Sequence, residues 1–299
     1  MGRENAIACY RELGNELRRR RKAAGLSAGA LAHRTGWHIS KISRIESGQA
    51  DINEFDVLHY LGFCGVYEPN ARDMIALCRH ARRRIGYWLN PHREQLSDSL
   101  GSLIYHETAA DTSTIYQPQL VHGLLQTADY ARARIAIGRQ RTSEDIEQRV
   151  RLRLKRQRIL RVPHPAPFTF FLNEAALRLE VGSAAIMHEQ LLKIVLVAAL
   201  EHITVCVVPS SAGERSVVGG SFSLFRYSQC APLVYIDLVE SGLFLEDRSH
   251  VEPYRKLLPD IAEVALSPEE SREFIAELAN EYDRRCEQHV GHHLQDGQA

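Results

Sequence analysis

Apolar residues recur at helical spacing over residues 17–48 of this 299-residue chain. Their intervals place one stripe of each short segment on the same side, as a helix with one buried face requires. The pattern predicts a helix, a short helix, a tight turn and a third helix. The residues of the stripe are Leu17, Ala24, Leu26, Leu31, Ala32, Trp37, Ile42 and Ile45.

The joins between these helices carry signals of their own. Thr35, Gly36 and Trp37 leave little room for a loop, so the second and third helices must cross at a steep angle, which is the helix-turn-helix arrangement. Ser27 stands where an N-cap would begin the second helix, and Gly48 stands where a left-handed residue would end the third.

The third helix must expose the face opposite its apolar stripe. Short polar residues and two cations on that face suit entry into a DNA major groove. The face consists of Ile39, Ser40, Lys41, Ser43 and Arg44. We expect Ser40 and Arg44 to read bases and Ile39 to contact a thymine methyl group. A solvated helix that binds nothing is the alternative, and the basic run at 18–22 argues against it.

The stretch GLSAGALAHRTGWHISKISRIESG resembles the Xre-type helix-turn-helix of Cro and phage repressors, which implies DNA binding. The matching residues are Gly25, Leu26, Ser27, Leu31, Ala32, Gly36, Ser40, Ile42, Ser43, Arg44, Ile45, Glu46 and Gly48. The family often has Gln-Glu after the serine, and the Gln helps to hold a DNA phosphate, whereas this chain has Ala28 and Gly29. Phosphate contacts are therefore expected from Arg18, Arg19, Arg34, Lys41 and Ser43.

The same family implies an internal ion pair between the positions of Arg21 and Glu46. Glu46 directly follows the apolar Ile45, so its carboxylate should be shielded from water and should need a cation. The helical phase set by Leu17 and Ala24 turns Arg21 to the inward side. We expect this pair to hold the reading helices in shape.

Two further amphipathic helices, at 52–64 and 70–84, complete a five-helix domain over residues 1–85, with Asn53 or Asn70 as caps. Residues 86–101 are rich in Pro, Gly, Ser and Asn and predict a connector.

From Ser102 the helical period resumes over 102–117, 123–138 and 143–161, and then the alternating period of strands takes over. We expect strands at 168–172, 203–208, 222–227 and 233–239, a helix at 184–200 and a loop at 211–220. Two helices follow, the second capped by Ser267 and Glu270, and 291–299 predicts a disordered tail. The predicted fold is mainly α with a smaller α+β portion.

The body from residue 102 to about 280 also resembles a known domain. Its strongest motif is GLLQT at 123–127 followed by Tyr130, Ala131 and Arg132. With the neighbouring YHETAADTSTIYQPQLVH and LVYIDLVESGLF, this motif resembles the C-terminal domain of unknown function in actinobacterial Xre regulators. That domain is linked to WhiJ-like developmental regulators and to toxin-antitoxin-like loci. The resemblance implies regulation by a partner or ligand through residues 102–290.

Thirty-seven basic and 37 acidic residues cancel over the whole chain. Residues 1–95 nevertheless hold 16 Lys or Arg and 10 Asp or Glu, which gives a basic head (+6) and an acidic body (−6). This asymmetry favours DNA binding by the head. Residues 139–161 are an exception within the body, with nine basic side chains. They fit either a second nucleic-acid patch or an amphipathic helix paired with acidic neighbours.

Other classes of site are not favoured. Six cysteines without a C-x-x-C pair predict reduced, buried thiols. A metal site at Cys286, His289, His292 and His293 is conceivable, but no partner cluster stands elsewhere, so we expect none. The chain has no apolar run of ~20 residues and no signal-peptide core, which predicts a cytoplasmic protein. No H-E-x-x-H, G-x-S-x-G, Walker or G-x-G-x-x-G motif occurs, so we expect neither an enzyme nor a cofactor.

These patterns predict a sequence-specific transcriptional regulator that binds double-stranded DNA as a homodimer, because one short helix reads too few base pairs for selectivity. The C-terminal domain would mediate dimerisation and respond to a protein partner or ligand. Two alternatives stay open. One is an antitoxin-like protein that neutralises a small neighbour-encoded protein and autoregulates, and the other is a small-molecule-sensing regulator.

Overall fold

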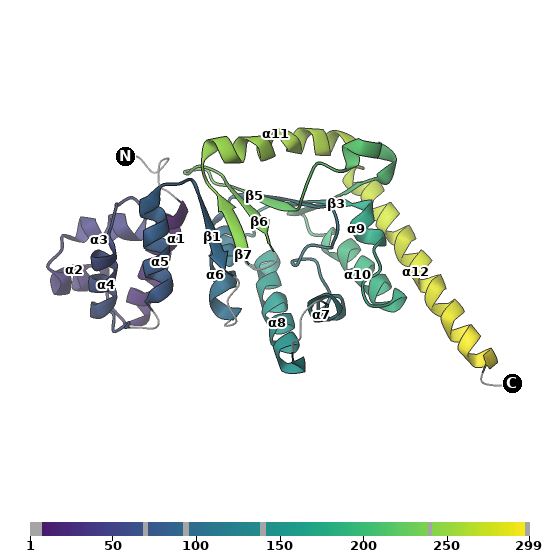
Figure 1. Ribbon diagram of the computed structural model, residues 1–299, viewed down its shortest axis with the longest axis horizontal. Helices are drawn as coiled ribbons and strands as arrows, with labels where there is room; N and C mark the ends of the chain where they lie inside the picture. Colours follow the sequence, from purple (N-terminus) through teal and green to yellow (C-terminus); the bar gives the residue numbers. More distant parts are fainter. Residues whose placement is uncertain (1–7, 68–70, 92–95, 138–141, 239–240, 297–299) are drawn as a thin grey trace. The chain divides into compact units, whose positions relative to one another are not determined.

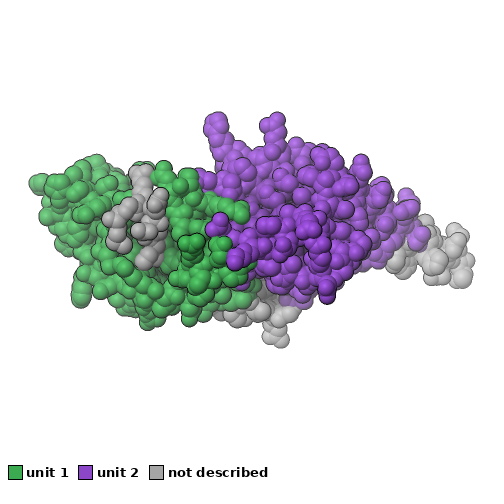
Figure 2. Space-filling model, turned by 90° about the horizontal axis from the view of Figure 1, so that it is seen from above, with its two compact units in different colours: residues 1–110, 225–253 green, residues 111–224, 254–299 purple. Residues whose placement is uncertain are grey.

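The computed structural model of the chain describes residues 8–67, 71–91, 96–137, 142–238 and 241–296. The chain divides into two compact units, which Figure 2 colours separately. Unit 1 combines residues 1–110 with 225–253, and unit 2 combines residues 111–224 with 254–299. Each unit therefore contains segments that lie far apart in the sequence.

Unit 1 begins with five helices, as the sequence predicts (Figure 1). They are α1 (Ala8–Ala23), α2 (Ala28–Thr35), α3 (Ile39–Glu46), α4 (Glu54–Phe63) and α5 (Arg72–Arg83). The apolar stripe forms their core, in which Leu17, Leu31 and Ile42 are fully buried. A capping box between Asn53 and Asp56 begins α4. Asn70, the other expected cap, lies outside the described residues.

Strands and one more helix complete unit 1. They are β1 (Tyr87–Pro91), α6 (Leu96–Ala109), β6 (Leu233–Asp237) and β7 (Ser241–Leu245). β7 pairs antiparallel with both β1 and β6. Trp88 of β1 stands opposite Phe244 of β7, and their rings stack with centroids 4.6 Å apart. The stretch 86–101, expected as a connector, therefore holds a strand and the beginning of a helix, and the burial of Trp88 explains why it packs.

Unit 2 is built on the parallel strands β2 (Thr112–Gln117), β3 (Phe168–Asn173) and β4 (Ile203–Val208), with β3 in the middle. The division between the units passes through β5 (Phe222–Arg226). The strands follow the order β1-β7-β6-β5-β2-β3-β4. The chain passes from β3 to β4 through helices, because a parallel pair needs a long crossover connection.

Helices cover the parallel strands of unit 2. They are α7 (Ala128–Ala136), α8 (Ser143–Arg156), α9 (Glu174–Arg178), α10 (Ala184–Val197), the end of α11 (Arg248–Val264) and α12 (Pro268–Asp296), with short 3₁₀ turns η2 (Gln157–Arg161) and η3 (Ser210–Ser216). α10 and α12 lie side by side (Figure 1), and Leu191 and Ile275 share their buried core with the strands.

Most expected elements of the C-terminal region are present, with several differences. β7 was not expected, α7 begins at Ala128 and not at residue 123, and η3 lies in the stretch 211–220 expected as a loop. The four expected strands are β3, β4, β5 and β6. The expectation of helix over 102–117 is wrong beyond Ala109, since β2 begins at Thr112 and is buried along its middle. Ser267 and Glu270 cap α12 as expected, through Ser267 N–H to Glu270 Oε2 at 2.8 Å. α12 continues to Asp296, into the stretch 291–299 expected as a tail.

Candidate nucleic-acid interface

The turn between α2 and α3 is set by caps at both helices. Ser27 Oγ accepts the N–H of Ala30 at 3.0 Å and begins α2. Gly36 ends α2 with φ of +70°, a left-handed conformation that favours glycine. His38 then caps α3 by accepting the Ser40 N–H at its Nδ1. Only three residues, Gly36 to His38, separate the two helices, which fixes the orientation of α3.

The face of α3 expected to read DNA is open to solvent. Ile39, Ser40, Ser43 and Arg44 are exposed, and the Ile39 side chain is 51% accessible although it is apolar. In the part of the chain that the structure describes, Arg44 forms no ion pair. A helix with a buried apolar stripe and an unpaired exposed arginine presents hydrogen-bond donors that match the edge of guanine.

The residues expected to contact phosphate differ in their surroundings. Arg34 is exposed and, among described residues, unpaired. Arg19 Nε donates to Glu16 at 2.7 Å. Lys41 Nζ lies 2.9 Å from Asp56 Oδ1 and 3.8 Å from the centroid of the Trp37 ring. Arg18 and Ser43 are exposed, with Arg18 Nε 3.9 Å from Glu46.

A buried ion pair ties α1 to α3. Arg21 donates from Nε to Glu46 Oε1 at 2.7 Å and from Nη2 to Oε2 at 2.8 Å. Tyr60 of α4 donates to Oε1 at 2.6 Å, and Arg21 Nη1 donates to the Leu26 carbonyl at 2.7 Å. The two charged side chains are 8% and 9% exposed. The Glu46 carboxylate raises the pKa of Arg21, while burial and then Glu46 raise the pKa of Tyr60, so the guanidinium stays charged and the phenol neutral.

Two glycines let α1 and α3 approach closely. A Cβ on Gly14 would lie 2.8 Å from the backbone oxygen of Glu46. A Cβ on Gly48, whose φ is +71°, would lie 2.6 Å from the backbone nitrogen of Arg11. Both distances are shorter than real Cβ contacts, so the backbones of α1 and of the end of α3 meet directly at these positions.

Sequence reasoning missed four of these residues. His38 is an unusual cap, and Tyr60 and Asp56 join their partners across distances that periodicity does not report. Gly14 had a usable signal, because a glycine inside a strongly helical segment often marks a close approach.

The GLLQT motif of unit 2 is held by a network of polar side chains. Gln126 Nε2 donates to the Val121 carbonyl at 2.7 Å, and Lys193 Nζ donates to the Gln126 carbonyl at 2.7 Å. Gln157 Nε2 donates to the carbonyls of Gly123 and Gln126, both at 2.8 Å. These side chains bond the backbone of a loop that has few backbone–backbone hydrogen bonds. The motif therefore has a structural role.

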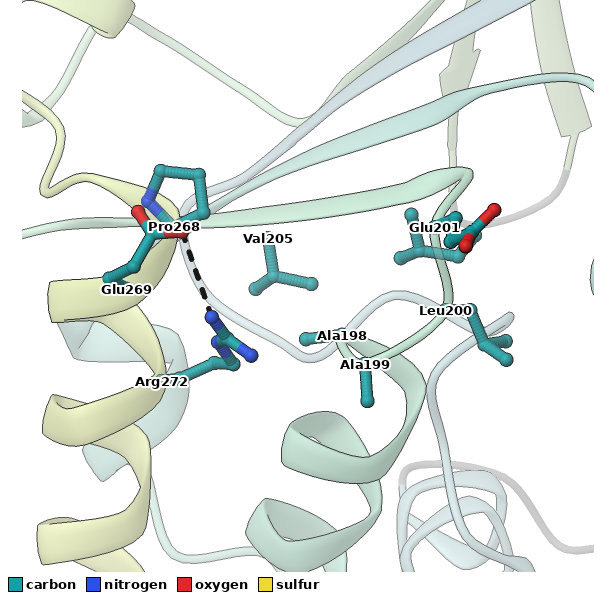
Figure 3. Close-up of a pocket in the computed structure, with 9 residues that line it drawn as sticks. Ala198, Ala199, Leu200, Glu201, Val205, Pro268, Glu269 and Arg272 are labelled. Carbon is teal, nitrogen blue, oxygen red and sulfur yellow. Dashed lines mark ion pairs between the residues drawn. The ribbon is translucent and has the colours of Figure 1, made fainter.

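A shallow cavity of about 200 Å³ lies in unit 2 between the end of α10, β4 and the beginning of α12 (Figure 3). Small apolar side chains line it beside Glu201 and the pair Arg272–Glu269, whose atoms are 3.6 Å apart. The described residues contain no cluster that could ligate a metal, and the side chains from His289 onward lie outside them. Among the described helices, none is long and apolar enough to cross a membrane.

Comparison with protein families agrees with this geometry. A helix-turn-helix domain matches residues 12–80, which include α2 to α4 and most of α1 and α5, and indicates DNA binding. A domain of unknown function, DUF5753, matches residues 100–277. No curated protein matches the chain. Because the second match covers more than half of the 299 residues, the chain belongs to the family defined by the domain of unknown function DUF5753, with a helix-turn-helix domain at its N-terminal side.

Proposed function

We propose that the protein is a sequence-specific transcriptional regulator that places α3 in the major groove of double-stranded DNA. The observation that carries the proposal is the exposed face of α3, where Arg44 is unpaired among described residues and Ser40 and Ile39 stand beside it. Arg44 is assigned to a guanine edge, Ser40 to a hydrogen bond with a base and Ile39 to a thymine methyl group. The resemblance to Xre-type repressors supports the same docking.

The proposed phosphate contacts differ in whether the side chain already has a carboxylate partner. Arg34 can meet a phosphate without losing a partner, since none of the described residues pairs with it. Lys41 must exchange Asp56 for the phosphate, and Arg19 must exchange Glu16. Ser43 and Arg18 are accessible from solvent. Arg34 is therefore the principal phosphate contact in this proposal, with the others secondary.

The regulator is proposed to act as a homodimer. A single eight-residue helix contacts too few base pairs to select one genomic site, whereas two half-sites about one helical turn apart supply the missing discrimination. The domain matched at 100–277 is proposed to mediate dimerisation and to respond to a protein partner or ligand. The proposal includes no catalytic step and no cofactor. Co-purification of a small protein would identify the first kind of effector, and a thermal shift with metabolite pools the second.

The test compares Arg44→Ala with wild type on a pool of randomised duplexes. We expect the variant to lose preference at one base pair of each half-site, by about 1–3 kcal/mol, while non-specific affinity changes little. Arg79→Ala is the control, because Arg79 of α5 is also an exposed arginine of the same unit but pairs with Glu54 of α4. Base preferences that match wild type at every position would show that α3 does not read DNA through Arg44.

A further inference from the structure

Unit 2 carries a line of exposed cations along α8 and η2. Arg151, Lys155 and Arg158 are spaced by four and three residues, so they lie on one face of a helix, and Arg161 follows three residues later. All four are exposed. We call these residues the α8 stripe; its helix is labelled in Figure 1.

The α8 stripe is not neutralised by its surroundings. None of its four side chains forms an ion pair within the described residues. Arg151 attracts the Glu147 carboxylate only at longer range. Five other arginines of the same unit do have carboxylate partners, although the exposed Arg284 has none among the described residues. The five paired arginines are Arg132, Arg178, Arg215, Arg272 and Arg285. The contrast matters because residues 96–299 are acidic as a whole, so partners for four cations are plentiful.

One neighbouring group responds to the charge of the stripe, because burial, and then Arg161, lowers the pKa of Lys193. Like charges at spacings of three and four residues also repel each other along the helix, which works against the helix itself. Cations at a helix C-terminus are favoured by its dipole, but Arg151 lies five residues before the end of α8.

The side chains of the stripe fit phosphate better than a protein surface. α8 and η2 contain no aromatic residue, whereas protein interfaces are centred on aromatic anchors. Arg151 and Arg158 are about 10 Å apart along the helix axis, and phosphates of one DNA strand advance by about 3.4 Å along the duplex axis. The stripe can thus meet several phosphates of one backbone.

We propose that the α8 stripe is a second, sequence-independent contact with the phosphate backbone of DNA. The proposal rests on the DNA binding proposed for α3 and adds a surface in the domain of unknown function. Because phosphate contacts carry no base information, the stripe raises affinity and its salt dependence without altering which sequence is preferred.

The experiment measures affinity against salt concentration for the full chain on a duplex of about 60 base pairs that carries the selected site. The test variant replaces the four stripe residues, Arg151, Lys155, Arg158 and Arg161, with glutamine. The control variant replaces Arg178, Arg215, Arg272 and Arg285, which removes the same charge from paired positions in the same unit. Urea unfolding of both variants checks that they remain folded.

Each lost phosphate contact lowers the slope of log affinity against log salt by about 0.9. We expect the stripe variant to lose about two to four units of slope and about tenfold or more in affinity at low salt, with base preferences kept. The control variant should keep most of the slope. Single replacements at Arg151 and Arg158 should each remove about one unit, which supports the proposal even if the fourfold variant unfolds.

A stripe variant whose slope equals that of the control would overturn this inference and would direct attention to an acidic protein partner. That result leaves the proposed function intact if Arg44→Ala still loses base preference. A wild-type chain that binds no DNA at any salt concentration would overturn both proposals together.

Discussion

Replacing Glu46 with glutamine tests how the reading helices are held. The glutamine has nearly the shape of the glutamate but no charge, so Arg21 keeps its position and loses its counter-ion. Arg18 Nε, 3.9 Å from Glu46, is a second cation that would then face the first without a carboxylate between them. Glu46 is not itself assigned to DNA, but Arg18, one of the secondary phosphate contacts, loses its carboxylate partner in the variant.

The magnitude follows from the burial of the pair. With side chains 8% and 9% exposed and two direct hydrogen bonds, Arg21–Glu46 belongs with buried pairs, for which loss of one partner costs about 3–5 kcal/mol, and not with surface pairs at about 0–1 kcal/mol. The amide oxygen still accepts from Tyr60 or Arg21, which places the expected loss near the lower bound, about 3 kcal/mol. DNA binding should weaken only as far as α3 is displaced.

Urea unfolding followed by tryptophan fluorescence gives the measurement. The chain has two tryptophans, Trp37 and Trp88, and both lie in unit 1, so the signal reports the unit that contains the ion pair. With a urea slope of about 2 kcal/mol per molar, a loss of about 3 kcal/mol lowers the midpoint by about 1.5 M.

Glu16→Gln is the matched control. Glu16 also pairs with arginines of α1, at 2.7 Å from both Arg19 and Arg20, but its side chain is 25% exposed. We expect this change to cost less than about 1 kcal/mol. If the midpoints for Glu46→Gln and Glu16→Gln coincide, burial of the pair does not stabilise the reading helices and the reasoning is refuted.

Three further predictions concern unit 1. Gly14→Ala should lower the free energy of unfolding by about 1–3 kcal/mol, because the added Cβ meets the Glu46 carbonyl oxygen. Gly62→Ala is the control and should cost nothing, because the space around Gly62 is open. Equal effects of the two changes in urea unfolding would contradict the close approach. Burial raises the pKa of Glu246 to about 6, so its contribution to stability is present below about pH 4.5 and lost as the pH rises through 6. Glu246→Gln keeps an acceptor for the Ala8 N–H, and its free energy of unfolding relative to wild type should rise by up to about 2 kcal/mol from pH 4.5 to pH 7.5; a constant difference would refute the assignment. A fragment of residues 1–85 should exchange the amide hydrogens of α1 faster than the full chain does, and equal rates would show that later segments do not support α1.

The sequence predicts the helix-turn-helix region well because the signals that define its helices are local. Apolar spacing, the Ser27 cap and Gly36 act within a few residues of the helices that they define, and the structure places them as expected, except that Ala24 of the apolar stripe is exposed just beyond the end of α1. The partner of Lys41 was beyond such reasoning, since Asp56 lies 15 residues away on another helix. Local pattern indicates which side chains face outward, but not which of them already have a partner.

The strands show the same limit. β3 and β4 are runs of β-branched and aromatic residues that read as strands without further knowledge. β2 has the partly polar sequence TSTIYQ, so its own residues do not mark it as a strand. It is buried because it pairs with β3. β1 was hidden in a stretch rich in loop-forming residues, and it forms because Trp88 stacks on Phe244, more than 150 positions away in the chain.

Contacts made by α1 explain why unit 1 extends beyond the five N-terminal helices. One side meets α3 at Gly14 and through Arg21. Elsewhere on α1, Glu12 lies 3.3 Å from the buried His106 of α6 and accepts from Ser102, while the Arg11 guanidinium lies 4.5 Å from the centroid of the Tyr227 ring. Burial lowers the pKa of His106, which keeps the imidazole neutral beside that carboxylate at neutral pH. The helix that positions α3 is therefore also fixed by residues of the domain of unknown function, so a change in α6 can act on the reading helix through α1.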